Sequence, residues 1–272
     1  MKLVQVFNYE ELKIPFHDNV KVFEVRHRNR SFGFVILREF IESQAVSFNI
    51  TEPMTDVEYE LLFEEVIDTV RKFGSKVLLH YALTSNPFTD FLLDRGGYIL
   101  ERVEMVLELK GYAPPVFPIP KDVEVAPFLI APIRDNIKLC FSTLPEYDKF
   151  VFSSFSPNSL LNLYTLLYTG REGVFVPEFS LNLYHKGRLS GFIMVNIFSE
   201  KVTISEIMVL SPYQGRGFGR LLLSESLRRM LKRGIERVLL SVTKKNKRAY
   251  DMYKRFGFKE KREYAVYIFN IK

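Results

Sequence analysis

Cysteine and tryptophan are scarce in this sequence, and the shortage narrows the possible functions. Tryptophan is absent, and the single cysteine, Cys140, cannot form an intrachain disulfide. The four histidines are scattered, without the spacing of metal ligands. We therefore expect Cys140 to be a packing residue and the protein to hold no metal.

Long apolar runs are missing as well. No uninterrupted run approaches the ~20 residues that span a bilayer, and no charged-then-apolar leader opens the sequence. Hydrophobic residues make up 47% of the 272 residues and charged residues 26%, a composition typical of a globular protein. We therefore expect a cytoplasmic protein that does not bind a membrane, with a length that favours two domains.

Positive charge is present in excess. The net charge of +6 favours an anionic partner, which could be nucleic acid, a membrane surface or a phosphorylated cofactor. We expect one group of cations near the end of the sequence to form a solvated helix face: Arg228, Arg229, Lys232 and Arg233. A second group fits either solvent or the phosphates of a cofactor: Lys244, Lys245, Lys247 and Arg248.

A proline-rich segment separates two halves of the chain. Four prolines fall within the eleven residues from Lys110 to Pro120, and proline removes backbone donors and favours extended chain. We predict a linker over 111–121, an N-terminal domain over 1–110 and a C-terminal domain over 122–272.

The second half alternates strands and helices. Turn residues and apolar periodicity predict a meander of three strands over 179–184, 189–198 and 202–210, followed by a helix over 218–233, a strand over 237–242, a helix over 247–255 and strands over 258–262 and 264–271. Before the meander we predict a strand over 123–127, a helix over 133–142 and a helix capped by Ser156.

The first half repeats this order at an offset of 160 residues. We predict the following elements in the first half: strands over 20–27, 32–40 and 45–50, a helix over 56–73 and a strand over 76–82. Several residues of the first half are the same as those 160 positions later. The offset places Gly74 on Gly234 and Asn86 on Asn246. A few such matches arise by chance, but their agreement with the element order predicts a duplicated domain.

A glycine-rich loop is the most informative local motif. Ser211-Pro-Tyr-Gln-Gly-Arg-Gly-Phe-Gly219 places three alternating glycines between a strand and a helix. Glycine lets the backbone turn tightly, and successive N–H groups at a helix N-terminus can bind phosphate oxygens. Taken alone, the pattern fits a flexible turn equally well.

The surroundings of the loop give it an identity. Together with Val209, Pro212 and the downstream pattern Asn246-x-x-Ala249-x-x-x-Tyr253-x-x-x-Gly257-Phe258, the loop resembles the two best-known motifs of the GNAT acyl-CoA-dependent N-acyltransferases. The resemblance covers the second half of the chain. It implies an α/β fold of two tandem GNAT-like domains, each a mostly antiparallel twisted sheet flanked by helices. It also implies acetyl-CoA as the cofactor.

The resemblance implies a set of residues that bind CoA. Backbone N–H groups of the loop would bind the pyrophosphate, with added charge from two arginines. The strand near Ile207 would splay from its neighbour and pair with the pantetheine amides, and a backbone N–H there would polarise the thioester carbonyl. Asn246 would bond the pantetheine arm. The implied set is Met208, Val209, Gln214, Gly215, Arg216, Gly217, Phe218, Gly219, Arg220 and Asn246.

Two residues are candidates for moving protons. The resemblance places Tyr253 beside the sulfur of CoA as general acid, although a tyrosine there can also simply pack. Glu206 is the only carboxylate on the strand that leads into the loop, and such a group can deprotonate an amine. Strand alternation leaves open whether it faces the cleft.

The first half lacks these residues. At the same offset the loop becomes Met54-Thr-Asp-Val-Glu-Tyr59, which has no glycine and two acids, and Tyr253 becomes Leu93. We predict that the N-terminal domain keeps the fold but has lost cofactor binding, and that it shapes the acceptor cleft or stabilises its partner domain.

The acceptor is the least determined part of the function. We expect acetyl transfer to a small primary amine in a ternary complex, with a protein N-terminus or lysine as an alternative. Aromatic residues that could line its pocket or pack in the core are Tyr147, Phe150, Phe152, Phe155 and Phe175. A non-catalytic acyl-CoA-binding module would also explain the loop. A nucleic-acid binder, which we do not expect, would leave it unexplained. The oligomeric state stays open.

Overall fold

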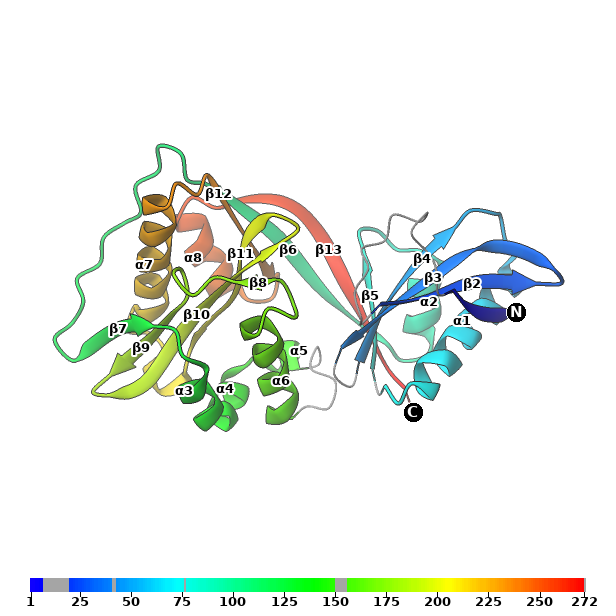
Figure 1. Cartoon of the computed structure of the whole chain (residues 1–272), viewed down its shortest axis with the longest axis horizontal. Coiled ribbons are helices and arrows are strands. Elements are labelled where there is room, and N and C mark those ends of the chain that lie inside the picture. Colours follow the sequence, from blue (N-terminus) through cyan, green and yellow to red (C-terminus); the bar gives the residue numbers. More distant parts are fainter. Residues whose placement is uncertain (7–19, 41–42, 76, 150–155, 272) are drawn as a thin grey trace. The chain divides into compact units, whose positions relative to one another are not determined.

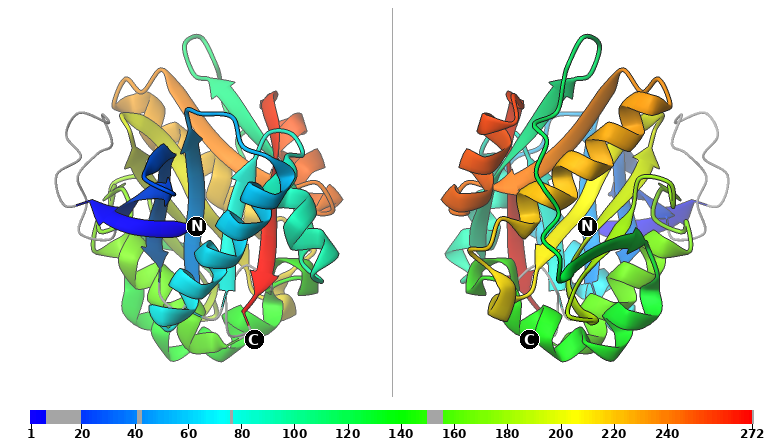
Figure 2. Two further views of the ribbon diagram at one scale, coloured as in Figure 1. Left: turned by 90° about the vertical axis from the view of Figure 1, so that its right-hand side faces the viewer. Right: turned by 90° about the vertical axis from the view of Figure 1, so that its left-hand side faces the viewer.

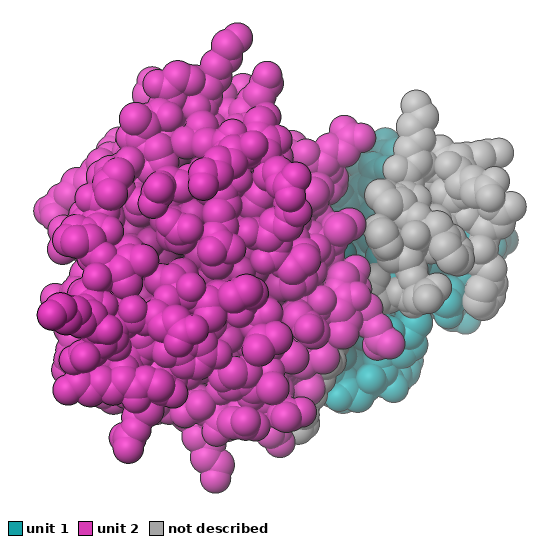
Figure 3. All heavy atoms as spheres, turned by 60° about the vertical axis from the view of Figure 1, so that its left-hand side comes forward, with its two compact units in different colours: residues 1–101, 150–155, 264–272 teal, residues 102–149, 156–263 magenta. Residues whose placement is uncertain are grey.

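The chain forms two compact units. A computed structural model describes residues 1–6, 20–40, 43–75, 77–149 and 156–271. Unit 1 contains Met1–Glu101 and Tyr264–Lys272, and unit 2 contains Arg102–Lys149 and Ser156–Glu263 (Figure 3). No helix in these described ranges is long and apolar enough to cross a membrane.

Unit 2 is a mixed sheet with helices packed on it (Figure 1). Its strand order is β7-β9-β10-β11-β12-β6, with β8 beside β10, and all neighbours are antiparallel apart from β11 and β12. The strands are β6 (Tyr98–Glu108), β7 (Val123–Pro127), β8 (Val174–Phe175), β9 (Leu181–His185), β10 (Arg188–Phe198), β11 (Lys201–Val209) and β12 (Arg237–Thr243).

The helices of unit 2 form two groups. Figure 1 shows α3, α4, α5 and α6 together, away from α7 and α8. The helices are α3 (Ile130–Asp135), α4 (Ile137–Thr143), α5 (Glu146–Lys149), α6 (Pro157–Tyr168), α7 (Phe218–Lys232) and α8 (Lys247–Arg255). The predicted Ser156 cap is present, because its side chain accepts a hydrogen bond from the Ser159 N–H at 3.2 Å. The helix predicted over 133–142 is instead two helices, divided at Asn136, whose side chain donates to the Pro132 carbonyl.

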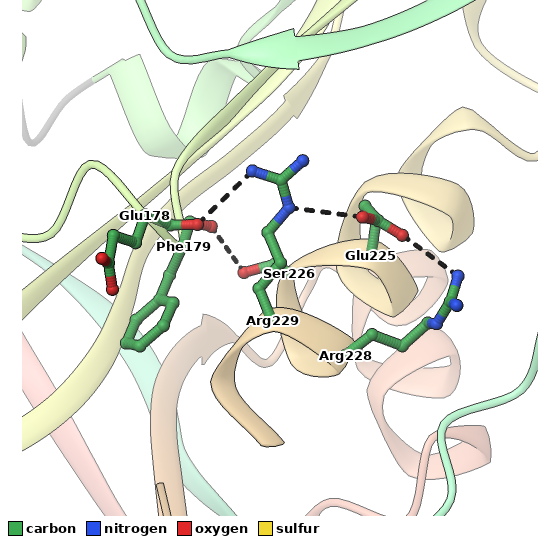
Figure 4. Close-up of polar contacts among 6 residues, drawn as sticks. All are labelled: Glu178, Phe179, Glu225, Ser226, Arg228 and Arg229. Atoms are coloured by element: carbon green, nitrogen blue, oxygen red, sulfur yellow. Dashed lines mark hydrogen bonds and ion pairs between the residues drawn. The ribbon is translucent and has the colours of Figure 1, made fainter. Parts of the chain in front are cut away.

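Helix α7 covers the centre of this sheet. Its apolar stripe, with Leu222, Leu223 and Leu227 fully buried, packs against β9, β10 and β11. Figure 4 shows polar contacts of this helix: the buried Ser226 donates to the Phe179 carbonyl at 2.7 Å, and on the surface Arg229 pairs with Glu225 at 3.3 Å. The cations of the predicted solvated face thus lie on the helix surface, and some of them are ion-paired there.

Unit 1 repeats the architecture of unit 2. Its strand order is β1-β2-β3-β4-β5-β13, with one parallel pair, β4 and β5. The elements are β1 (Lys2–Val6), β2 (Val20–His27), β3 (Arg30–Phe40), β4 (Ser43–Ile50), α1 (Asp56–Lys72), β5 (Val77–Ala82), α2 (Pro87–Asp94) and β13 (Lys259–Asn270). The 160-residue offset places α1 on α7, β5 on β12 and α2 on α8 within two residues. This confirms the predicted mixed α/β fold, in which the strands of both halves are mostly antiparallel.

The last strand of each half completes the sheet of the other unit. Strand β6 begins in unit 1 and ends in unit 2, where Arg102–Glu108 pairs with β12. Strand β13 begins in unit 2 and ends in unit 1, where 265–270 pairs with β5. The units therefore divide the chain differently from the predicted domains 1–110 and 122–272, and the two strands predicted over 258–262 and 264–271 are one (Figure 2).

The proline-rich segment belongs to unit 2. Residues 111–121 contain no helix or strand, as expected, but they pack on the helices of unit 2. The Tyr112 hydroxyl donates to the Phe256 carbonyl at 2.7 Å, and Ser224 of α7 donates to the Pro115 carbonyl. This segment, predicted as a linker between domains, therefore lies within one unit.

Candidate functional site

The glycine loop presents an uncapped helix N-terminus. Gly215 and Gly217 both have φ of +82°, which glycine adopts without strain. Gly217 is the N-cap of α7, and no side chain in the described part of the chain caps it. The first hydrogen bond of the helix runs from the Leu221 N–H to the Gly217 carbonyl, so the preceding N–H groups have no partner within the helix. Their partial positive charge makes this end of α7 suited to an anion.

Beside the loop, β11 diverges from β12. The described parallel pairs join Thr203 to Leu239 and Ile204 to Leu240, and the pairing ends there. A β-bulge against β10 follows at once, since Met194 faces Glu206 whereas Val195 faces Ile204. Beyond the bulge, β11 continues to Val209 without a described pair on β12, as expected for a splay between the two strands.

The edge of β11 that faces this opening is set by strand alternation. The Leu210 N–H donates to the Ser190 carbonyl of β10 at 3.0 Å, so residues 208 and 210 direct their backbone groups toward β10. Ile207 and Val209 therefore direct theirs into the splay. Met208 was also predicted to bind the cofactor, but its backbone faces β10 and its side chain is buried, so the geometry favours its two neighbours.

Gln214 connects the loop to the splay. Its amide donates to the Val209 carbonyl at 3.1 Å, and its oxygen accepts from Arg248 of α8 at 3.2 Å. Both predicted arginines are exposed: Arg220 lies over the Phe117 ring at 5.4 Å, with its guanidinium beside Gly217, and Arg216 lies near Tyr213.

Asn246 has a structural role in this fold. Its side-chain oxygen accepts from the Ala249 N–H at 3.2 Å and caps α8. Asn86, which occupies the same position in the first half, caps α2 in the same way. Helix capping therefore explains why both halves carry asparagine here.

These features fit an acyl-CoA. The free N–H groups of α7 and the guanidinium of Arg220 suit a pyrophosphate. The edge of β11 beyond Ile204, which has no partner strand among the described residues on this side, suits the amides of an extended pantetheine arm, in the manner of an added strand. Phe218 and Gly219 belong to the first turn of α7, with Phe218 anchored in the core.

Glu206 lies in the splay with a strongly altered pKa. Its Oε2 accepts from the Tyr164 hydroxyl at 3.1 Å, and its Oε1 accepts from the Ile207 N–H at 3.0 Å. Burial raises the pKa of this carboxyl to about 7, with a further rise from Asp148, while the Tyr164 hydrogen bond opposes it. A carboxylate with such a pKa can accept a proton near neutral pH.

Tyr253 lies close enough to Glu206 for their charges to interact. Its side chain is 5% exposed and packs edge-on against Phe258. No hydrogen bond of its hydroxyl is found within the described ranges. Burial, and then Glu206, raise the pKa of this phenol, so it stays protonated at neutral pH and retains a proton to donate.

Three further polar residues border Glu206 that the sequence did not single out. Tyr164 is fully buried in α6, and Asp148 of α5 accepts from the Thr243 hydroxyl at 2.8 Å. Arg102 of β6 donates to the Ser241 carbonyl and interacts with both acids. Tyr164 could have been identified from the sequence, because it places a hydroxyl within the apolar run of α6. Asp148 and Arg102 carried no such signal, because their positions depend on tertiary packing.

The other candidates of the sequence have simpler roles. Cys140 is fully buried, and burial raises its pKa to about 12, which confirms a packing residue. Phe175 packs against Phe128 and Tyr168, while Tyr147 is partly buried. The remaining three predicted aromatics, Phe150, Phe152 and Phe155, lie outside the described residues. The described part of the chain holds no group of acids, histidines and cysteines fit for a metal.

The corresponding place in unit 1 is built differently. Thr55 caps α1, and the Glu58 carboxylate accepts from the Thr55 N–H at 2.9 Å, so this helix N-terminus already holds a negative charge. The described pairs of β3 and β4 keep one register, without a bulge.

Comparisons with known proteins agree with this geometry. Residues 144–258 match the acetyltransferase (GNAT) family. The chain is 32% identical over 108 residues to an N-alpha-acetyltransferase of Arabidopsis thaliana, a match that covers 38% of this chain and 57% of that protein. It is 30% identical over 87 residues to a spermine/spermidine N(1)-acetyltransferase of Bacillus subtilis, covering 29% and 57%. The chain thus spans a little over half the length of these curated relatives.

A solved structure extends the likeness beyond the matched segment. A GCN5-related N-acetyltransferase from Sphaerobacter thermophilus has a TM-score of 0.66, at 17% identity, over 97% of this chain and 85% of that one. At this identity the likeness shows a shared fold. Residues 144–258 are therefore similar to the acetyltransferase (GNAT) family, and the chain shares the fold of a GCN5-related N-acetyltransferase.

Proposed function

We propose that this chain is an N-acetyltransferase that transfers acetyl from acetyl-CoA directly to an amine of a small-molecule acceptor in a ternary complex. The observation that carries this is the placement of Glu206, a carboxylate with a pKa of about 7, in the splay beside an uncapped helix N-terminus. The helix N-terminus binds the phosphates of the cofactor, and the carboxylate accepts a proton from the amine.

Each residue has a distinct task in this reaction. The N–H groups of Phe218 and Gly219, with Arg220, hold the phosphates, and the β11 edge at Val209 orients the pantetheine. Bound acetyl-CoA supplies the activated acyl group. Glu206 accepts a proton from the acceptor's ammonium at a carboxylate oxygen, and Tyr253 donates its phenolic proton toward the departing sulfur.

Unit 2 alone carries this site in our proposal. Unit 1 lacks the glycine loop and the bulge, and Glu58 occupies the helix N-terminus where a phosphate would bind. Each chain then binds one acetyl-CoA. Unit 1 serves to shape the acceptor cleft or to stabilise unit 2.

Release of CoA thiol in the presence of a panel of small amines tests the chemistry. We expect Glu206→Gln and Tyr253→Phe each to lower kcat by about 10²-fold or more. Tyr250→Phe is the matched control on the same helix, because its hydroxyl bonds Glu260 instead. If acetyl-CoA binds but no amine is acetylated, the chain is an acyl-CoA-binding module and the enzymatic proposal fails.

Calorimetry tests the cofactor site independently of turnover. Gly217→Glu places a carboxylate at the N-terminus of α7 and a side chain where φ is +82°, so acetyl-CoA binding should be lost. Equal affinity in the variant and the unaltered chain would rule out this loop as the phosphate site.

A protein N-terminus is a second candidate acceptor. The likeness to a relative named as an N-alpha-acetyltransferase favours it. The amine panel should therefore include short peptides with free N-termini beside polyamines. Acetylation of peptides at a much higher kcat/KM than of small amines would make the chain a protein acetyltransferase.

A further inference from the structure

The backbone N–H of Ile207 is in a position to serve two acceptors. It lies on the splay-facing edge of β11, one residue beyond Glu206. In this structure it donates to Oε1 of Glu206 at 3.0 Å. The same edge runs toward Val209, whose carbonyl is bonded by the Gln214 side chain at 3.1 Å. Side chains of the protein thus form hydrogen bonds with backbone groups of this edge that could otherwise bind an extended ligand.

One N–H cannot fully serve both a carboxylate and a carbonyl. An N–H has a single proton, and a well-aligned hydrogen bond directs it at one acceptor. The proposed function, on which this inference rests, brings a thioester carbonyl to the splay, where a backbone donor on β11 would polarise it. The hydrogen bond from the Ile207 N–H to Glu206 would then have to break.

We propose that the Ile207 N–H changes partner when acetyl-CoA binds, from the Glu206 carboxylate to the thioester carbonyl. Glu206 then keeps the Tyr164 hydroxyl as its described hydrogen-bond donor. Loading of the acyl group and a rise in the basicity of Glu206 are thereby one event, because the exchanged N–H polarises the carbonyl and no longer stabilises the charged carboxylate.

The exchange has a consequence for protonation. A hydrogen bond to a carboxylate stabilises its charged form, so removing it raises the pKa of Glu206 above its value in the free protein, about 7. The groups that face Glu206 from the surrounding elements stay in place: Tyr164 on α6, Cys140 on α4, Asp148 on α5, Arg102 on β6 and Tyr253 on α8. A rise of about one unit means that binding at pH 7.5 takes up about half a proton.

Calorimetry in two buffers measures this proton uptake. The full chain is titrated at pH 7.5, in phosphate and in Tris, with the acetyl-CoA analogue in which CH₂ replaces the thioester sulfur, which keeps the carbonyl but cannot react. S-ethyl-CoA, which lacks the carbonyl, is the matched ligand. We expect an uptake of about half a proton with the ketone analogue and none with S-ethyl-CoA.

Two variants and a second pH sharpen the test. Glu206→Gln should bind both ligands without proton uptake, while Glu200→Gln, at an exposed turn, should behave as the unaltered chain. If Glu206→Gln does not fold, the loss of uptake at pH 9.5 in the unaltered chain replaces it. Equal uptake with both ligands, or none with either, would overturn the exchange. Failure of either ligand to bind would instead remove the proposed function.

Discussion

At the scale of single residues, the neighbours of Glu206 decide what its carboxyl can do. A carboxyl in water is ionised at neutral pH and is a weak base. Burial in the splay raises its pKa to about 7, where it can accept a proton and still be largely ionised in mild alkali. The sequence identified Glu206 as a candidate but did not show which face of the strand its side chain lies on. The bulge at Ser205 decides that orientation, because it interrupts the alternation of β11.

Asp148→Asn should shift the pH dependence of activity. Asp148 raises the pKa of Glu206, so removal of its charge lowers that pKa and moves the acidic limb of kcat/KM to lower pH, by about half a unit or more. Asparagine can still accept from Thr243, which preserves the local packing. Asp135→Asn, at an exposed position of α3, is the control. An acidic limb that stays in place or moves upward would contradict the role of Asp148.

Glu206→Gln should stabilise the protein in a pH-dependent manner. Because the folded pKa, about 7, exceeds the ordinary value of 4.5, the folded state binds more protons between these values and loses stability as pH rises through that window. Glutamine has no such loss. Denaturant unfolding should show that the variant gains up to about 3 kcal/mol over the unaltered chain between pH 4.5 and pH 8. A pH-independent difference would mean that Glu206 is not perturbed.

At the scale of secondary-structure elements, two helices of similar length have opposite N-termini. Helix α1 begins with Thr55 and Glu58, which satisfy each other's backbone groups. Helix α7 begins at Gly217 without a side-chain cap in the described residues. A cap is worth about 1 kcal/mol, so its absence from α7 costs stability that a bound anion can restore. Duplication preserved the helix in both halves, while the site depends on the few residues before it.

Gly217→Ala should weaken CoA binding at least tenfold. An alanine Cβ would lie 3.3 Å from the Arg220 guanidinium, and φ of +82° is strained for any side chain. Gly234→Ala is the matched control, since its φ is +71° and its Cβ would meet nothing within 4 Å. Thermal unfolding should show a similar loss of stability for both variants. Calorimetry should show a loss of affinity for CoA only for Gly217→Ala. Equal affinities would leave the loop without a role.

At the scale of the whole molecule, the two halves exchange their last strands. Each sheet places a strand from the other half next to its parallel pair: β6 beside β12 and β13 beside β5. Three consecutive side chains of β13 in unit 1 are buried: Val266 and Ile268, each 1% exposed, and Tyr267. An isolated 1–110 fragment would therefore lack a core strand of its own sheet.

Ending the chain after Glu263 should destabilise unit 1. Truncating one buried isoleucine to alanine costs about 2–5 kcal/mol, and this deletion removes several buried side chains as well as the strand that pairs with β5. Hydrogen exchange should accelerate in Val77–Ala82, although these residues are distant in sequence from the deletion. An unchanged exchange rate in these residues, with faster exchange only in β12, would contradict the pairing of β13 with β5.

The sequence by itself determined most of the helices and strands, the duplication, the glycine loop and the candidates Glu206 and Tyr253, because each depends on local periodicity, turn chemistry or short motifs. Tertiary structure alone decided which half each last strand completes, since β6 and β13 both offer an alternating strand and β5 and β12 both offer an open edge. It also brought Tyr164, Asp148 and Arg102 around Glu206 from three separate elements. The pKa of that carboxyl depends on burial and on charges distant in sequence, which no local pattern encodes.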